Sequence, residues 1–228
     1  ASDVYKRQVN NSGAILLVHH AGWLADIEEF RKLSTKYNLT LIQDFSQCHG
    51  FVQANVKNML PNEIAVFSTM YRKSQSSGGS GGFITTNCDH KGNLIRSLSD
   101  RGKFIDASGK WLSTSRNGNK ILLPSLNHSL DDISCLMGVQ SLQKLDRTIK
   151  KRKEFTFLLH EKFKDLTQWI FIPIPKESKS PFIVPISLVN CNHELIKNKL
   201  SEYLLSFNIP HNPNYQFLAS DWTWLKPY

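Results

Sequence analysis

The sequence contains no long hydrophobic run and few cysteines. None of its apolar stretches approaches the roughly 20 residues that a membrane-spanning helix requires, so no membrane partner is expected. The 4 cysteines among 228 residues are far apart and form no Cys-x-x-Cys pair, which argues against a zinc site and against a disulfide scaffold. The N-terminus lacks the pattern of a secretory signal, and we therefore expect a cytoplasmic location.

Acidic residues are scarce relative to basic ones. The chain has 19 Asp and Glu against 28 Lys and Arg, which gives a formal net charge of +9. This balance suits an anionic partner, either a nucleic acid or a phosphorylated small molecule. The densest basic run, Lys150–Lys153, falls within a predicted helix and is interpreted as a solvated face. Nucleic-acid binding is therefore the weaker alternative.

The first half of the chain shows an alternation of strand and helix patterns. Ala14–Val18 and Leu39–Ile42 predict buried strands, and between them Asp26 is the predicted N-cap of an amphipathic helix. The segments Ile64–Phe67 and Gly82–Thr86 predict two further strands. Alternating elements of this kind favour an α/β fold with a mainly parallel sheet.

The second half is predicted to be mainly helical. Asn93–Leu98 predicts a short helix, and the apolar spacing that begins at Leu130 predicts one long helix that continues through Phe163. After a proline-rich stretch, Phe182–Val189 predicts a strand and His193–Phe207 an amphipathic helix.

These patterns divide the chain into three parts. Residues 1–12 are polar, fit no periodic element and are expected to be extraneous to the fold. Residues 13–149 hold the α/β pattern. Residues 150–228 hold a bridging helix and the start of a smaller C-terminal domain. Because Trp222–Tyr228 completes no element, the chain is expected to be truncated.

Lys73 lies between the predicted strand Ile64–Phe67 and the glycine-rich run Gly78–Gly82. A lysine that is fixed and partly desolvated at such a junction has a lowered pKa and can attack a bound aldehyde. Asp44 ends the preceding predicted strand, so both residues can face one crevice. Taken alone, Asp44 is more often a cap or loop carboxylate, and Lys73 more often a solvated loop lysine.

Several motifs follow one another at linked spacings. Val18–Asp26 has a strand-loop-helix pattern, Asp44–Gly50 reads D-x-x-Q-x-H-G, and Ser68–Lys73 reads S-x-x-x-x-K. Together with the glycines of Gly78–Gly82, this ordered set resembles the DegT/DnrJ/StrS sugar aminotransferases. The resemblance extends over nearly everything from Gly13 onward, and the agreement of order and spacing outweighs the alternatives for single residues.

The resemblance implies a pyridoxal 5'-phosphate (PLP) enzyme of fold type I, with helices on both faces of the sheet and a smaller α+β domain after it. It implies that Lys73 forms a Schiff base with PLP and then acts as general acid and base, while Asp44 pairs with the pyridine nitrogen. Gln47 would contact substituents of the cofactor ring. Ser68 would bind the phosphate, and Asn127 would reach the cofactor of a neighbouring subunit.

The implied activity is the transfer of an amino group, usually from glutamate, to a keto group of a nucleotide-linked sugar in a homodimer. Lys73 disfavours the family's dehydratase branch, which has histidine at this position. We interpret His49 as structural. Two alternatives stay open: a catalytically idle or regulatory member of the same fold, and a basic nucleic-acid-binding module that uses Arg147 and Lys150–Lys153.

The sequence also departs from the family pattern. Ser80 stands where many members have glutamate, and Met70 and Ser129 stand where histidine and arginine are frequent. The long spacing before Asn127 predicts an insertion near Lys103–Asn119. The resemblance implies further segments before the first strand and after Trp222–Tyr228, so whether this chain is active alone stays open.

Overall fold

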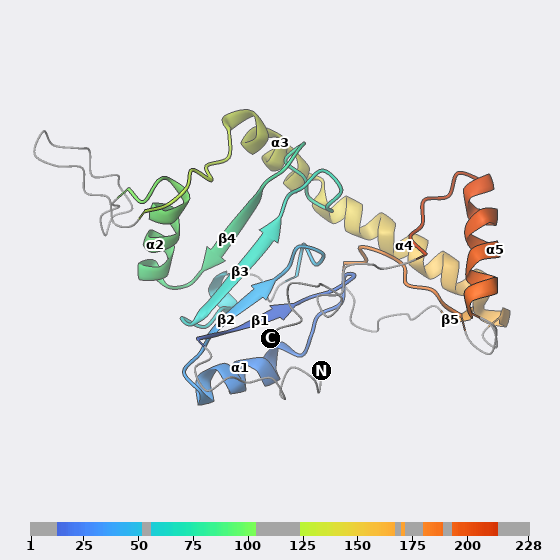
Figure 1. Cartoon of the computed structure of the whole chain (residues 1–228), viewed down its shortest axis with the longest axis horizontal. Coiled ribbons are helices and arrows are strands. Elements are labelled where there is room, and N and C mark those ends of the chain that lie inside the picture. Colours follow the sequence, from blue (N-terminus) through green and yellow to red (C-terminus); the bar gives the residue numbers. More distant parts are fainter. Residues whose placement is uncertain are drawn as a thin grey trace, which may run out of the picture. The chain divides into compact units, whose positions relative to one another are not determined.

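The computed structural model describes residues 13–51, 56–103, 124–166, 170–171, 180–188 and 193–213. Figure 1 shows its elements, which are β1 (Ala14–Val18), α1 (Ile27–Lys36), β2 (Thr40–Asp44), η3 (Val56–Asn58), β3 (Glu63–Ser68), β4 (Gly82–Thr86), α2 (Asp89–Ser99), α3 (Asp132–Gln143), α4 (Leu145–Phe163), η4 (Lys164–Leu166), β5 (Ile170–Phe171), β6 (Ser187–Leu188) and α5 (His193–Ser206). Residues 1–12, most of the expected insertion and Trp222–Tyr228 lie outside the described residues.

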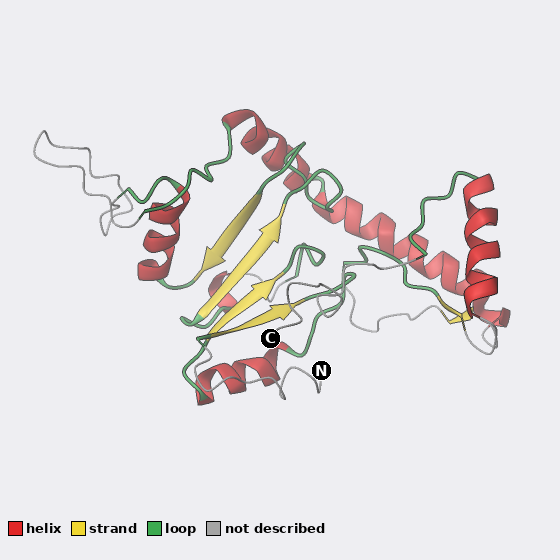
Figure 2. Cartoon of the chain, viewed as in Figure 1, coloured by secondary structure: helices red, strands yellow, loops and turns green. Residues whose placement is uncertain are grey.

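The main sheet has four strands in the order β1-β2-β3-β4 (Figure 2). β1, β2 and β3 run parallel, with Val18 opposite Asp44 and Asp44 opposite Val66. β4 runs antiparallel to β3, because the loop that joins them contains no helix to carry the chain back to the other edge. The predicted α/β fold with a mainly parallel sheet is confirmed.

The core lies between the sheet and α1. Alternate residues of β2 and β3 are buried on this face, among them Leu41, Ala65 and Phe67, as the two-residue period of a strand requires. Ile27 of α1 is buried in the same cluster, and Phe30 packs against it. The β-α-β unit that the sequence predicted is therefore held together by one hydrophobic layer.

Helix α1 begins and ends where its sequence signals lie. The Asp26 carboxylate accepts a hydrogen bond from the Glu29 backbone N–H at 3.2 Å, which satisfies one of the free donors of the first turn. The helix ends at Tyr37, and Asn38 follows with a φ of 52°, a conformation that asparagine tolerates better than most residues. The predicted N-cap is confirmed.

The long helix predicted from Leu130 to Phe163 is wrong in one respect, because two helices occupy this stretch. α3 ends at Gln143, α4 begins at Leu145, and the Lys144 N–H bonds to the Ser141 carbonyl at 3.1 Å. This bond spans three residues rather than four, which tightens the last turn and interrupts the α-helical ladder. Apolar periodicity continued across the break and did not reveal it.

Two shorter predictions also differ from the structure. α2 begins at Asp89 instead of Asn93, although Gly92, a poor helix former, lies inside its first turns. The strand predicted over 182–189 reduces to Ser187–Leu188, which pairs with β5. The backbone N–H of Phe182 instead donates a hydrogen bond to the Ala21 carbonyl at 3.3 Å. Phe182 therefore contacts the loop after β1 and does not pair with β5.

The chain separates into two compact units. The first contains Ala1–Leu158 and Ile174–Val184, and the second contains Leu159–Pro173 and Pro185–Tyr228. The four-stranded sheet belongs to the first unit, and the small β5-β6 sheet and α5 belong to the second. None of the helices that the structure describes is long and apolar enough to cross a membrane.

Candidate active site

The carboxyl ends of β2 and β3 bring two predicted site residues to one edge of the sheet. Asp44 is the last residue of β2 and Ser68 the last residue of β3. In parallel sheets, ligands bind outside the carboxyl ends of the strands. Asp44 and Ser68 are both partly exposed, and they lie at the edge where this rule places a ligand.

Asp44 keeps part of its carboxylate free of protein contacts. Its Oδ1 accepts a hydrogen bond from the Ser46 backbone N–H at 2.8 Å, which holds the side chain at the strand end. Among the described residues its Oδ2 has no hydrogen bond, and the carboxylate forms no salt bridge. One ionisable oxygen is therefore available to a cationic or protonated ligand atom.

Lys73 lies close enough to Asp44 for the two charges to interact. Partial burial lowers the pKa of Lys73, and the Asp44 charge opposes this by favouring the ammonium form. The two side chains form no ion pair in the described structure, and the Lys73 Nζ lies 5.2 Å from the centre of the Phe182 ring. A lysine with a lowered pKa supplies more neutral amine, which is the nucleophilic form.

The loop that carries Lys73 is held by hydrogen bonds on both sides. The Thr69 N–H bonds to the Gly81 carbonyl at 2.9 Å, and the Ser77 N–H bonds to the Thr69 carbonyl at 2.8 Å. A Cβ on Gly82 would lie 2.6 Å from the Phe67 carbonyl oxygen, so β4 can approach β3 this closely only with glycine there. The glycine-rich run therefore shapes the loop around Lys73.

Gln47 connects the loops that follow β1 and β2. Its Oε1 accepts a hydrogen bond from the Ala21 backbone N–H at 2.7 Å. The side-chain oxygen is thus engaged inside the protein, and the amide nitrogen is the part of Gln47 that remains for another partner. The predicted contact between Gln47 and a cofactor ring stays a prediction.

His49 is buried beside this edge, as its structural interpretation requires. Burial lowers the pKa of His49 to about 4, and the charges of Lys73 and Arg152 act in the same direction. Its Nε2 lies 3.0 Å from the Ser68 carbonyl oxygen, so the neutral ring donates this bond and holds the end of β3. At neutral pH His49 is uncharged.

Among the described residues, Asn127 forms no hydrogen bond with the other four predicted site residues. It is exposed, it pairs with Asp100 in an isolated β-bridge, and its Oδ1 accepts a bond from the Ser129 N–H at 3.3 Å. The sequence assigned Asn127 to the cofactor of a neighbouring subunit. That assignment stays a prediction.

The sequence interpretation missed Arg152, which does not share the solvated face assigned to Lys150–Lys153. Lys150, Lys151 and Lys153 are exposed, but Arg152 is half-buried, and its guanidinium Cζ lies 5.5 Å from the centre of the Phe182 ring. Residues three and four apart share one face of a helix. Ile149, three residues before Arg152, and Thr156, four after it, are both buried, so the spacing could have placed Arg152 on the buried face.

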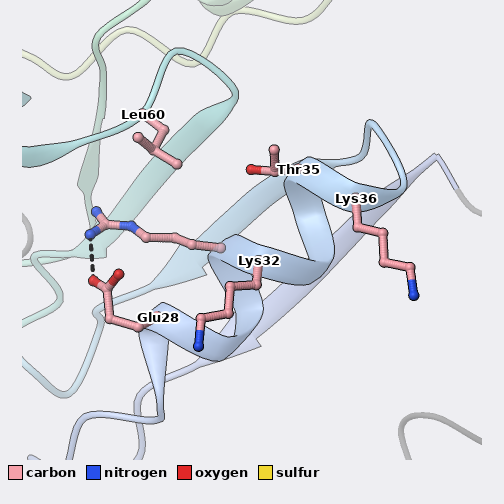
Figure 3. Close-up of a pocket in the computed structure, with 6 residues that line it drawn as sticks. Glu28, Lys32, Thr35, Lys36 and Leu60 are labelled. Atoms are coloured by element: carbon pink, nitrogen blue, oxygen red, sulfur yellow. Dashed lines mark hydrogen bonds and ion pairs between the residues drawn. The ribbon is translucent and has the colours of Figure 1, made fainter.

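One depression on the described surface lies elsewhere (Figure 3). It has a volume of about 500 Å³ and is lined by Glu28, Arg31, Lys32, Thr35, Lys36 and Leu60. Leu60 precedes β3, so the depression lies at the amino ends of the strands and contains none of the predicted site residues. It opens widely to solvent, and we do not assign it a ligand.

The described residues contain no cluster of histidine, cysteine, aspartate and glutamate that could hold a metal ion. Cys48, Cys88 and Cys135 are free thiols. Burial raises the pKa of Cys48 to about 12, so this thiol is unreactive at neutral pH. The chemistry of the edge therefore depends on Asp44, Lys73 and their hydroxyl neighbours.

An aspartate and a lysine that meet at the carboxyl edge of a parallel α/β sheet are the arrangement expected of an aminotransferase of fold type I. The family model of the DegT/DnrJ/EryC1/StrS aminotransferases matches residues 3–222, and the chain belongs to this family. The fold and family that the sequence motifs indicated are thereby confirmed.

A curated relative is the UDP-4-amino-4,6-dideoxy-N-acetyl-beta-L-altrosamine transaminase of Campylobacter jejuni subsp. jejuni serotype O:2. It is 25% identical over 215 residues, which are 92% of this chain and 55% of the relative. The chain thus spans about half the length of the curated relatives it matches.

Two solved structures share the fold. A DegT DnrJ EryC1 StrS aminotransferase from Brucella abortus superposes with a TM-score of 0.76 at 20% identity, over 100% of this chain and 56% of that one. The E. coli GDP-4-keto-6-deoxy-D-mannose-3-dehydratase, solved with bound hydrated PLP, superposes with a TM-score of 0.73 at 20% identity, over 92% and 55%. These similarities establish the fold.

Proposed function

We propose that this chain supplies the PLP-binding part of an aminotransferase that transfers an amino group to the keto group of a nucleotide-linked sugar. The observation that carries the proposal is the meeting of Asp44 and Lys73 at the carboxyl edge of the sheet, with a lowered Lys73 pKa. Membership of the family and the transaminase name of the curated relative support the reaction and the substrate class.

The residues at the edge fit PLP. Among the described residues, one Asp44 carboxylate oxygen has no hydrogen-bond partner, which suits a protonated pyridine nitrogen. The Ser68 hydroxyl has only a weak contact, a 3.4 Å bond from the Met70 N–H, and hydroxyls bind phosphate dianions well. Partial burial lowers the pKa of Lys73 and so increases its neutral amine fraction, the form that would hold the cofactor covalently.

PLP, when bound, supplies an electron sink that stabilises negative charge on the carbon next to the transferred nitrogen. The protein's part would be divided between four side chains. Asp44 would hold the proton on the ring nitrogen, and Lys73 Nζ would carry a proton between carbon atoms. Ser68 would help to anchor the phosphate, while Gln47 would use its free amide N–H groups at the ring.

A homodimer is part of the proposal, and α3 supports it. This helix exposes Ile133, Leu136, Val139 and Leu142, and Gly138 is its one buried residue. Apolar surface of this extent on one helix is typical of an interaction site. Asn127 precedes α3, so a second copy that covers α3 would bring Asn127 toward the partner's edge. Glutamate as amino donor and a cytoplasmic location complete the proposal.

The decisive experiment identifies the lysine that holds the cofactor. The protein is mixed with PLP and reduced with borohydride, and the pyridoxyl-modified lysine is mapped by mass spectrometry. We expect the label on Lys73 and its loss in Lys73→Ala, with Lys153→Ala, an exposed lysine of α4, as the control. Absence of label, or equal label in Lys73→Ala, would contradict the proposal.

The substrate class needs its own measurement. With the labelled lysine established, amino transfer from glutamate to UDP-linked and GDP-linked keto sugars is followed by mass spectrometry. Transfer to either one supports the proposal. A protein that binds PLP at Lys73 but transfers to none of these sugars would be the catalytically idle member of the fold, and salt-sensitive nucleic-acid binding without PLP would indicate the basic binding module.

A further inference from the structure

Arg152 of α4 is a half-buried cation without an acidic partner. It shares its helix face with the buried Ile149 and Thr156, and no carboxylate among the described residues forms an ion pair with it. Burial lowers the pKa of Arg152, which is the direction expected when a charge is desolvated without compensation. Burying an unpaired charge is costly. The contacts that Arg152 makes must therefore offset part of this cost.

Those contacts join two segments that are far apart in sequence. The Arg152 Nη1 donates to the Ser74 Oγ at 2.9 Å, and it lies 3.5 Å from the carbonyl oxygens of both Pro181 and Phe182. Ser74 directly follows Lys73. One guanidinium nitrogen therefore bridges the lysine loop and the segment 180–182.

Segment 180–182 is packed against the protein. Ser180 and Pro181 are buried, and the Phe182 N–H bonds to the Ala21 carbonyl. Gly22 has a φ of 93°, and a Cβ there would collide with the Ser180 carbonyl oxygen. The segment thus packs against the loop after β1, on the same side of the sheet as the lysine loop.

The ring of Phe182 contacts both cations. The Lys73 Nζ lies 5.2 Å and the Arg152 Cζ 5.5 Å from its centre, within the range of cation–π contacts. Displacement of this ring would expose Lys73 to water and free its side chain to rotate. Arg152 Nη1 also lies near the carbonyl oxygens of Pro181 and Phe182, next to this ring.

We propose that Arg152 is a positioning residue for Lys73, and that it acts by holding Ser74 and Phe182 so that Lys73 stays desolvated and directed at the edge. The proposal rests on the proposed function, in which Lys73 holds PLP. It adds a residue that touches neither cofactor nor substrate and that determines how the lysine is presented.

The first test measures Lys73 itself in the absence of PLP. Acetic anhydride labelling as a function of pH, read by mass spectrometry, gives the midpoint of Lys73 reactivity. We expect Arg152→Gln to raise this midpoint by on the order of half a pH unit, about threefold less neutral amine. Arg147→Gln, which changes an exposed arginine of the same helix, should leave it unchanged.

The charged groups around Lys73 determine how a change in its reactivity midpoint is interpreted. Asp44 on β2 favours the ammonium form, while His49, with a pKa of about 4, stays neutral throughout the assay. Loss of the Arg152 charge alone would also raise the midpoint, so Arg152→Lys separates charge from position. A lysine ammonium is a point charge without the planar fork, and we expect Arg152→Lys to resemble Arg152→Gln.

The second test uses the rate at which PLP attaches, followed by its absorbance. We expect Arg152→Gln and Phe182→Leu each to slow attachment by about tenfold or more, since small displacements of a reacting group cost up to about 100-fold. The double variant should be no slower than either single variant, because both act through one ring. Ser74→Ala replaces Arg152→Gln in both tests if thermal unfolding shows that Arg152→Gln does not fold.

Two outcomes overturn the proposal. In one, Arg152→Gln matches Arg147→Gln in both the midpoint and the rate. In the other, Arg152→Lys restores both values, which would make the charge sufficient. Failure of the proposed function is distinguishable, because it would appear as missing PLP label on wild-type Lys73 while the acetic anhydride midpoint still reports whether Arg152 and Lys73 are coupled.

Discussion

The β1–β3 layer with α1 and the helix α3 both contain many apolar residues, but they differ in what covers them. In the layer, Leu41 and Phe45 are fully buried, and even the polar Gln43 and Glu63 are 0% exposed. In α3, Leu136 and its apolar neighbours are exposed. Among the described residues, the layer buries its own apolar side chains, whereas α3 leaves most of its apolar side chains exposed.

A series of linked polar contacts also distinguishes the layer from α3. His19 bonds to Gln43, Gln43 bonds to Glu63, and Glu63 accepts two bonds from Arg31 of α1, at 2.6 and 2.9 Å. The Ala25 N–H donates to the His19 Nδ1, so the neutral ring carries its proton on Nε2 and donates to Gln43. A core that satisfies each of these groups specifies one arrangement of the loop after β1.

Glu63→Gln should have the largest effect on the layer. It leaves Arg31, 15% exposed, without its buried partner, and breaking a buried pair costs about 3 to 5 kcal/mol. Urea unfolding measures the change in free energy. Glu28→Gln is the matched control, because Glu28 pairs with the same Arg31 but is 71% exposed, so it should cost less than about 1 kcal/mol. Equal costs would show that the chain of contacts is not buried in solution.

His49 should make the stability of the layer depend on pH. The unfolded protein takes up the His49 proton near pH 6.5, whereas the folded protein takes it up only near its pKa of about 4. Between these values the unfolded state binds more protons, so stability falls as the pH falls, by up to about 3 kcal/mol. His19, whose pKa burial also lowers, acts in the same direction.

The measurement is the unfolding free energy of wild type and His49→Asn from pH 4 to 7. We expect the slope in this window to be smaller in His49→Asn, while His90→Asn, a change of an exposed histidine, retains the wild-type slope. An unchanged slope in His49→Asn would mean that the imidazole is already solvated in the folded protein.

Removal of a helix cap should have a smaller effect that again differs between the regions. Asp26→Ala removes the bond to the Glu29 N–H and should cost about 1 kcal/mol, because fraying of α1 uncovers Ile27 in the core. Asp131 caps α3 in the same way, through the Ser134 N–H at 2.9 Å. Asp131→Ala should cost less in thermal unfolding, since the first turn of α3 covers little. A larger loss at Asp131 would reverse the comparison.

The local elements of the layer could be predicted from sequence because their signals are local. Asp26 marks the start of α1, and the alternation around Leu41 and Ala65 marks β2 and β3. The break at Lys144 could not be predicted, because apolar spacing is the same on both sides of it. The antiparallel direction of β4 depends on the path of a loop, which periodicity does not encode.

The candidate site also contains residues that the sequence could place and residues that it could not. Asp44 is the last residue of β2, and Lys73 follows β3. Strand prediction could therefore place both at one edge, and the parallel order of β1, β2 and β3 accounts for it. Arg152 and Phe182 come from an α-helix and a loop distant in sequence. Phe182 contacts Lys73, and Arg152 contacts Ser74 and Phe182 beside it. These contacts arise from tertiary packing, which a basic run in a helical sequence does not reveal.

The smallest change in stability is expected in α3, and it tests the difference between α3 and the layer most directly. Leu136→Ala should alter the unfolding free energy by no more than about 0.5 kcal/mol, because Leu136 is 68% exposed, whereas Leu41→Ala at 0% exposure should cost about 2 to 5 kcal/mol. Measured at concentrations where sedimentation detects only monomer, a large cost at Leu136 would mean that the chain itself covers α3. At higher concentration, Leu136→Ala should weaken self-association if a second copy covers this helix, and the Leu41 site should then matter for folding but not for assembly.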